Sequence, residues 1–427
     1  MNVALPAIHA GLPSSIADVQ WSVDGYNVVM ASILLLSGSL ADRFGRKRMF
    51  QTGIAIFGIA SLACSVAPSI QALILFRIVQ ALGGSLLTPS GMGIIVNTFT
   101  DPKERAKAIG VWGTMTGLSM SAGPLLGGLL TQTLGWRWIF AINVPIVVAA
   151  LVLSALVFRE SRAPHARRFD PIGQLLAIVT LGAFVWALIY GRETNWSAIA
   201  VVAVVVAIVA AGLFVPYELR RREPLIELHF FRKLPFASAS AIAVISFIAF
   251  NAFLFVATFY LQGTRGFSPL AAGLFLIPAS IVMMIASPIA ARLAGSGRAG
   301  LSFMLSGGAF VAGSVLLFGM SPGTNVGQLL TGFAFFGIGL GLSNAVITTA
   351  AVTGMPREQS GVAVGTVSSF RVVGSALGVA AAGTPALFSW WLPIACGLGV
   401  LAFGVALQRA PRSGYVGEGA GAGIEPR

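Results

Sequence analysis

Few side chains in this sequence have the type and the placement for chemistry. Asp24 is the only carboxylate inside any of the long apolar runs, and Arg77 and Arg371 are the only cations there. If these runs cross a membrane, a charged Asp at mid-depth costs about 2.5 to 3.5 kcal/mol, so such a residue is normally kept for a task. We therefore expect Asp24 to accept a proton or to neutralise a cationic substrate. The alternative is a solvated side chain two turns from the end of its run.

The two arginines each have alternative interpretations. Arg77 is expected to lie against polar groups, because Gln80 one turn later makes that face polar; the alternative is a side chain that extends to the interface. Arg371 has no carboxylate in the second half of the chain to meet it. Its expected partners are backbone carbonyls, Asp24 across a cavity, or an anionic substrate.

The sequence lacks the residue patterns of disulfide frameworks, metal sites, ATP-binding loops and enzyme active sites. Cys64 and Cys396 lie within apolar runs, and the three histidines are far apart, so neither a disulfide framework nor a metal site is expected. None of the four lysines has the flanking residues of a phosphate-binding loop, which disfavours ATP-driven transport by this chain. A membrane enzyme would need clustered His, Asp or Cys, which the runs do not contain. We predict no metal and no cofactor.

The composition is that of a polytopic membrane protein. The 427 residues are 56% hydrophobic and 10% charged, with a mean hydropathy of +0.87, whereas about a quarter of the residues of a soluble domain are charged. The net charge of +13 comes from short basic clusters between apolar runs, as in membrane topology signals, and not from a nucleic-acid-binding surface.

Hydropathy predicts thirteen membrane spans, since about 20 apolar residues cross a bilayer as a helix. They cover residues 18–40, 50–67, 71–96, 107–131, 138–158, 172–190, 198–217, 237–261, 269–292, 301–319, 326–350, 360–382 and 386–407. Alternate loops collect 22 of the 27 lysines and arginines on one side and three on the other. The positive-inside rule makes the first side cytoplasmic. We expect a multi-pass protein of the plasma (inner) membrane with a cytoplasmic C-terminus and the lipid bilayer as its partner.

A weak internal repeat divides the chain. Asp42 aligns with Gly295 at an offset of 253 residues, and Trp136 aligns with Trp390 at 254. The predicted parts are an N-terminal half-bundle (1–158), a segment with two linker spans (159–235), a C-terminal half-bundle (236–407) and a disordered cytoplasmic tail (408–427). Thirteen spans leave Met1 outside, so we expect a first span to be missing upstream; the alternative is a protein that inserts with thirteen spans.

The loop from Gly38 to Arg48 combines one acid with four cations between two apolar runs. Asp42 lies at a helix end, Gly38 and Gly45 permit close backbone approach, and the cations are Arg43, Arg46, Lys47 and Arg48. Such a cluster can bridge two half-bundles in one conformation. The alternative is a positive-inside anchor to lipid headgroups, which needs neither the glycines nor the acid.

These motifs resemble the major facilitator superfamily, specifically its fourteen-span drug:proton antiporter branch. The loop is similar to the family's signature between spans 2 and 3, and Leu75 to Gln80 resembles the span-4 signature, with Ala81 in place of the usual glycine. Residues 117–128 resemble the antiporter signature of span 5, carried by Gly117, Gly123, Pro124, Gly127 and Gly128. Asn2 to Pro6 resembles the end of span 1, which supports a missing start.

The resemblance implies an all-α polytopic fold of two six-helix half-bundles with two extra spans between them. It implies a loop that latches the outward-facing state, a span 5 bent at Pro124 that shapes the cavity, and Asp24, Arg77 and Arg371 as coupling residues. The implied function is proton-driven antiport, in which small hydrophobic or cationic compounds such as drugs or antibiotics leave by alternating access, without nucleic acid or an obligate protein partner. The alternatives are a non-transporting sensor or scaffold of transporter descent, and a membrane enzyme.

Overall fold

The computed structural model describes residues 1–162, 170–221, 224–353, 355, 357–382 and 386–409. Every regular element in these ranges is a helix, which confirms the all-α prediction. The predicted tail lies outside them, apart from its first two residues, which end the last helix. The N-terminal half contains η1 (Asn2–Ala4), α1 (Leu5–Gly11), α2 (Ile16–Phe44), α3 (Arg46–Ser65), α4 (Ile70–Thr98), α5 (Pro102–Thr133), α6 (Trp138–Ala141) and α7 (Asn143–Val157).

Two linker helices and the C-terminal half follow. The linker helices are α8 (Pro171–Glu193) and α9 (Ala198–Arg220). The C-terminal half contains η2 (Leu228–Arg232), α10 (Leu234–Phe259), the π-helical turn η3 (Tyr260–Thr264), α11 (Pro269–Phe275), α12 (Ile277–Gly295), α13 (Ala299–Leu317), α14 (Val326–Val352), α15 (Arg357–Ala382) and α16 (Ala386–Arg409).

The helices account for the predicted spans with one difference. Eleven helices of the described chain are long and apolar enough to cross a membrane, or twelve if α2, which bends by 56° near Leu35, is counted as one span. The thirteenth prediction, 107–131, coincides with α5, which is 32 residues long but is not among them. Its many glycines, serines and threonines lower its hydropathy.

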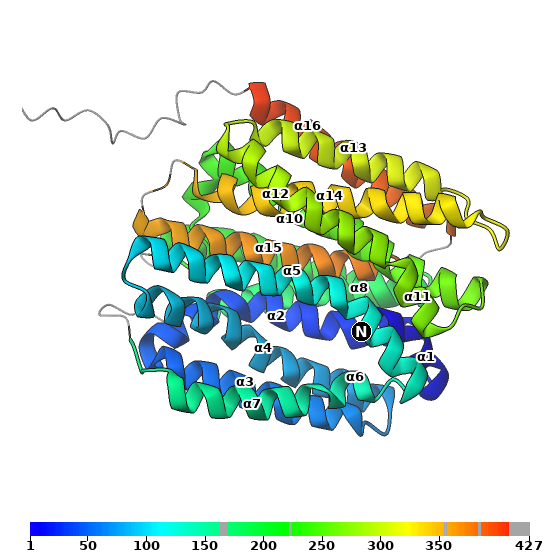
Figure 1. Cartoon of the computed structure of the whole chain (residues 1–427), viewed down its shortest axis with the longest axis horizontal. Helices are drawn as coiled ribbons and strands as arrows, with labels where there is room; N and C mark the ends of the chain where they lie inside the picture. The colour runs from blue at the N-terminus through cyan, green and yellow to red at the C-terminus, as the bar shows by residue number, and fades with distance from the viewer. Residues whose placement is uncertain (163–169, 222–223, 354, 356, 383–385, 410–427) are drawn as a thin grey trace, which may run out of the picture.

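The long helices run roughly parallel to one another (Figure 1). In this view α3, α4 and α7 lie at the bottom and α13, α14 and α16 at the top, with α5 and α15 between them. The packing of the N-terminal half recurs in the C-terminal half: α2 and α3 pack on α4 as α12 and α13 pack on α14. The halves meet where α2 packs on α15 and where α5 packs on α11 and α12.

The bundle has two ends that differ in charge. We call the "basic end" the one that carries the turns at 44–48, 99–101 and 158–162 and the C-terminus of α9; the opposite "far end" carries η1, α1 and the turns at 66–69, 134–137 and 260–268. At the basic end Gly45 joins α2 to α3 with a φ of 108°, a conformation that side chains rarely adopt. This glycine therefore sets the direction in which α3 leaves the turn.

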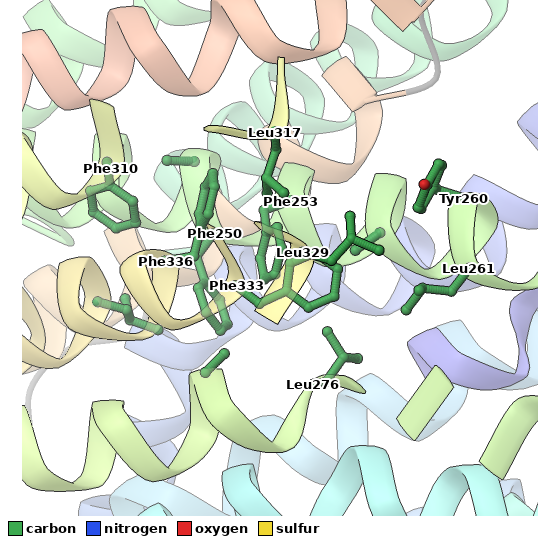
Figure 2. Packing of buried hydrophobic residues seen from close by; sticks show 14 of the residues in the cluster. Phe250, Phe253, Tyr260, Leu261, Leu276, Phe310, Leu317, Leu329, Phe333 and Phe336 are labelled. Atoms are coloured by element: carbon green, nitrogen blue, oxygen red, sulfur yellow. The ribbon is translucent and has the colours of Figure 1, made fainter. Parts of the chain in front are cut away.

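Aromatic packing holds the C-terminal half together. Phe253 of α10 stacks on Phe336 of α14 with ring centroids 4.2 Å apart, and Phe333 meets Phe253 edge-on at 5.0 Å (Figure 2). Phe310 of α13 contacts Phe336 from the other side at 5.8 Å. Offset and edge-on pairs of this kind add about 0.5 to 1.5 kcal/mol each beyond the area that they bury. They join α10, α13 and α14 into one unit.

Candidate functional site

Asp24 lies in α2 and is fully buried, with 0% of its surface exposed. The helix that carries it starts at a capping box, in which Ser15 and Asp18 bond each other's backbone amides. Asn27 donates a hydrogen bond of 3.4 Å to Asp24 Oδ1, and Oδ2 has no partner in the described chain. No ion pair to Asp24 is recorded among these residues. Its burial does not fit the alternative of a solvated side chain.

Arg77 joins three helices through polar contacts. Its Nε donates to the Ser22 carbonyl of α2 at 3.0 Å, and a terminal nitrogen donates to Gln80 Oε1 at 2.5 Å. Gln80 in turn donates to Ser61 Oγ of α3 at 2.6 Å. The guanidinium also lies 4.2 Å from the ring centroid of Tyr26, in cation–π contact. Arg77 therefore faces polar groups inside the bundle and stops short of an ion pair with Asp24.

Arg371 lies in α15 and is bound by α14. A terminal nitrogen donates to the Asn344 carbonyl at 2.9 Å and to Thr348 Oγ1 at 2.6 Å. Of the expected partners, the structure thus shows a backbone carbonyl and no contact with Asp24. The Nε of Arg371 and Oδ1 of Asn344 are buried without a hydrogen-bond partner in the described residues.

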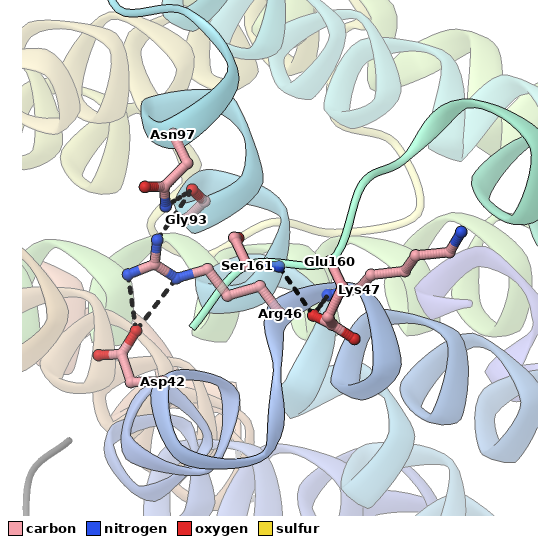
Figure 3. Close-up of polar contacts among 7 residues, drawn as sticks. All are labelled: Asp42, Arg46, Lys47, Gly93, Asn97, Glu160 and Ser161. Carbon is pink, nitrogen blue, oxygen red and sulfur yellow. Dashed lines mark hydrogen bonds and ion pairs between the residues drawn. The ribbon is translucent and has the colours of Figure 1, made fainter. Parts of the chain in front are cut away.

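The predicted latch loop is organised by the N-terminal half and the residues that directly follow it. Asp42 Oδ1 accepts hydrogen bonds from Arg46 at 2.7 and 3.1 Å, and Arg46 reaches the Gly93 carbonyl of α4 at 3.4 Å (Figure 3). Arg43 is exposed and lies 5.7 Å from the ring centroid of its neighbour Phe44. Lys47 Nζ donates to the Ala155 carbonyl at 2.9 Å. No recorded contact of these side chains reaches the C-terminal half.

Glu160 belongs to this loop although the sequence did not single it out. Its carboxylate accepts the backbone N–H groups of Lys47 and Arg48 at 3.1 and 3.2 Å, and the Ser161 carbonyl accepts that of Arg46 at 2.9 Å. An acid at these first amides of α3 matches the positive end of the helix dipole. A Cβ on Gly45 would lie 2.6 Å from this carboxylate, whereas one on Gly38 would meet only an ordinary contact at 3.9 Å. The one signal in the sequence was an acid within the basic segment that follows a span.

The predicted antiporter motif lies in α5, which continues as a helix through Pro124. A Cβ on Gly128 would lie 2.5 Å from the Pro269 carbonyl, and one on Gly273 would lie 2.5 Å from the Pro124 carbonyl. Cβ atoms on Gly123 and Gly127 would meet nothing within 4 Å. The surroundings of Gly117 lie outside the described residues. Pro124 and Gly128 therefore form a backbone contact with α11, and Gly123 and Gly127 do not.

Both halves contribute to one apolar cluster at the far end. It includes Leu5, Val19 and Leu73 from the N-terminal half and Phe255 and Val379 from the C-terminal half. Two hydrogen bonds reinforce this end of the bundle. Gln20 of α2 donates to the Val379 carbonyl at 2.6 Å, and Gln262 of η3 donates to the Val3 carbonyl at 2.7 Å.

A shallow, open groove of about 350 Å³ lies in the half of the bundle nearer the basic end. It lies between α4 and α5, and its lining is mostly apolar: Ile95, Ala108, Val111, Trp112, Met115 and Ser119. The part of α5 that lines it is the N-terminal half of the helix, whereas the Gly128 contact lies near the C-terminus of α5. Searching the described residues finds no group of three or more His, Cys, Asp or Glu that could hold a metal.

Known proteins resemble this chain along most of its length. The family model described as Major Facilitator Superfamily matches residues 1–379. The multidrug resistance protein Stp of Mycobacterium tuberculosis is 35% identical over 91% of this chain and 72% of its own. The tetracenomycin C resistance and export protein of Streptomyces glaucescens is 36% identical over 89% and 71%. The multidrug efflux pump LfrA of Mycolicibacterium smegmatis is 33% identical over 89% and 76%.

A solved structure shows the same fold. The crystal structure of the POT family transporter PepTSo aligns with a TM-score of 0.65 over 95% of this chain and 93% of its own. The sequence identity is 15%, so this likeness concerns the fold alone.

Proposed function

We propose that this chain, which belongs to the Major Facilitator Superfamily, exports small hydrophobic or cationic compounds in exchange for protons. Its family makes it a membrane transporter and not an enzyme. The relatives are named for drug resistance and export, which supports drugs or antibiotics as the cargo. The proton gradient supplies the energy, without a bound cofactor.

The observation that carries the proposal is the state of Asp24. Its carboxyl group is fully buried, receives one long hydrogen bond, and has one oxygen without a partner in the described chain. An ionised carboxylate there lacks both a cation and most of its hydrogen bonds, which is a costly arrangement. A proton or a cationic compound supplies what it lacks. Competition between the two at Asp24 is the proposed basis of the exchange.

The arrangement of the halves supports alternating access. The halves share an apolar cluster at the far end, and at the basic end the recorded contacts of the loop from Gly38 to Arg48 do not reach the C-terminal half. We infer that the basic end is cytoplasmic, by the positive-inside rule, and that this conformation takes up its cargo from that side. The latch then forms between the halves in the outward-facing conformation, which explains why Asp42 and Arg46 pair within one half here.

The apolar runs of the C-terminal half contain no carboxylate, which restricts the charge of the compounds that the protein can bind. A divalent cation would meet a single acid, Asp24, within the apolar runs of the two halves, so neutral or monovalent compounds fit better. Arg371, with a backbone carbonyl and a hydroxyl as its recorded partners, adds a positive charge to this half. It disfavours strongly cationic cargo further.

The test measures accumulation of a fluorescent drug in cells that express the chain, with and without a proton uncoupler. We expect the intact protein to lower accumulation, the uncoupler to abolish that effect, and Asp24→Asn to behave like cells without the protein. Glu104→Gln, which removes an exposed acid at the start of α5, is the matched control and should transport normally. If Asp24→Asn exports as well as the intact protein and the uncoupler changes nothing, proton coupling through Asp24 is wrong. If the intact protein exports nothing under any gradient, the sensor or scaffold alternative replaces transport.

A further inference from the structure

A second buried acid site lies in the linker helices, away from Asp24. Asp170 immediately precedes α8 and is 4% exposed. Its Oδ1 accepts the Gly173 N–H at 3.0 Å and the Tyr217 hydroxyl at 2.7 Å, and Arg221 approaches to 3.5 Å. Its Oδ2 is buried and has no hydrogen-bond partner within the described ranges.

Glu218 faces the same place from the last turn of α9 and is 1% exposed. Its Oε2 accepts the Ile226 N–H at 3.1 Å, whereas Oε1 is buried without a partner in the part of the chain that is described. The C-terminal end of a helix carries the negative pole of its dipole, so an anion is disfavoured there. Two buried acids thus each have one unsatisfied oxygen.

The two unsatisfied oxygens converge over Gly173. A Cβ built on this glycine would lie 2.5 Å from Glu218 Oε1 and 2.7 Å from Asp170 Oδ2. The oxygens can therefore be no farther apart than the sum of these two distances. A Cβ at position 173 would clash with both oxygens, so the missing side chain of this glycine is what lets the two carboxyl groups approach the same place.

Among the described residues, the charges around the site do not compensate two anions. Directly after α9, Arg221 is the one described cation at the site, with 40% of its side chain exposed, and Tyr217 of α9 is neutral. Beside η2, Glu227 is paired with His229 at 3.2 Å. From α2, the Ser32 carbonyl accepts from Gln174 and brings no charge. From α15, the contacts with α8 at Ala376 and Ala380 are apolar.

We propose that Asp170 and Glu218 share one proton and form a carboxyl–carboxylate pair at the basic end of the linker helices. The proton on one of the two facing oxygens is donated to the other, so both gain a partner and one negative charge is removed. Like-charged carboxyl groups at close range cannot both ionise without a large penalty, which is the general reason that such pairs retain one proton. A proton shared between the two facing oxygens gives each of them a partner.

The pair connects the linker to both halves. Gln174, one turn into α8, bonds α2, and Glu218 holds the Ile226 N–H on the segment that leads to η2 and α10. With the proton present, the ends of α8 and α9 are tied together. When the proton leaves, two facing anions repel each other and the tie loosens. Proton activity at the basic end therefore sets how firmly the linker holds the two halves.

The test is infrared difference spectroscopy of the full-length protein in lipid nanodiscs across a pH series. The carbonyl stretch of a buried protonated carboxylic acid identifies the pair. We expect one band that is lost in Glu218→Gln and, separately, in Asp170→Asn, because a shared proton requires both acids. The band should persist in Asp24→Asn, which separates this site from the proposed coupling acid. A band that survives either linker variant overturns the proposal, as does loss of the band on adding sodium or magnesium at constant pH.

A stability measurement keeps the proposal testable if spectra overlap. Glu218→Gln is isosteric and places an amide N–H where the shared proton would be, so the variant should fold. We expect the melting temperature of the intact protein to fall as the pH rises and the pair loses its proton, and the melting temperature of Glu218→Gln to lack that fall. Identical pH profiles for the two proteins overturn the proposal.

Discussion

The far end and the basic end of the bundle are held by different kinds of contact. At the far end the two halves share an apolar cluster, a backbone contact between α5 and α11, and the hydrogen bond from Gln20 to α15. At the basic end the recorded contacts of the loop do not reach the C-terminal half, and the apolar cluster around Phe236 draws all its members from the C-terminal half. The difference teaches that one end is closed by direct contact between the halves and that the other has each half stabilised separately.

The largest expected effect comes from breaking the backbone contact at the far end. In Gly128→Ala the new methyl group would lie 2.5 Å from the Pro269 carbonyl, and a backbone atom cannot move aside as a side chain can. We expect a loss of about 3 kcal/mol in unfolding free energy, at the upper end for overpacking, together with loss of transport. Thermal denaturation in detergent and drug accumulation measure the two effects.

The matched control is Gly123→Ala, in the same helix and with nothing within 4 Å of the added carbon. It should gain a few tenths of a kcal/mol up to about 1 kcal/mol, because alanine favours helix over glycine. If the two variants have the same melting temperature and the same drug export, the α5–α11 contact does not hold the far end together.

At the basic end the largest effect is expected at Gly45. An alanine there must adopt a φ of 108° and place its methyl 2.6 Å from the Glu160 carboxylate. We expect a loss of about 2 kcal/mol from backbone strain and displaced hydrogen bonds. The measurement is the melting temperature, with Gly38→Ala, where the contact is ordinary, as control. A neutral Gly45→Ala would mean that Glu160 does not cap α3.

A smaller effect is expected at the hydrogen bond between the halves. Gln20→Leu removes a buried donor to the Val379 carbonyl. The unfolding free energy should fall by about 1 kcal/mol, at the lower end of the cost of a buried carbonyl that loses its partner. Gln132→Leu, which removes a bond to the Leu270 N–H at an exposed position, should cost less. Chemical denaturation curves compare the two. If Gln132→Leu lost more stability than Gln20→Leu, the stronger hydrogen bond between the halves would be the one from α5 and not the one from α2.

The smallest stability effect is expected for Asp42→Asn. In this conformation the ion pair recorded for Asp42 is with Arg46 across the turn at Gly45, both side chains are partly exposed, and exposed pairs contribute about 0.2 to 1 kcal/mol. Stability, expression and topology should therefore stay nearly unchanged while drug export slows, because the latch acts in the other conformation. Unchanged export would reduce this loop to a membrane anchor.

Local sequence features predicted most of the fold and only part of the site. Apolar length located the helices, and the glycine at position 45 marked a tight turn that its positive φ confirms. The span predicted at 107–131 is the helix α5, which is 32 residues long but less apolar than the other long helices because of its small residues. The burial of Asp24 could be predicted from its place inside an apolar run. That its Oδ2 has no hydrogen-bond partner among the described residues could not be predicted.

Contacts between distant segments were beyond the sequence. Glu160 and Lys47 are 113 residues apart, and Asp170 meets Tyr217 over 47 residues. Nothing in the local pattern of either acid distinguishes it from a solvated charge at a helix end. Likewise, five similar small or imino residues in the α5 motif gave no indication that Pro124 and Gly128 contact α11 while Gly123 does not.

The bond from Glu160 to the first amides of α3 also has a consequence for biosynthesis. Translation at about 5 to 20 residues per second leaves an interval on the order of 10 s between synthesis of Lys47 and synthesis of an acid 113 residues later. During that interval the turn between α2 and α3 lacks the acid that binds the first amides of α3 in the finished protein. The α2–α3 hairpin is completed only when α7 has been inserted, so the N-terminal half matures as a single unit.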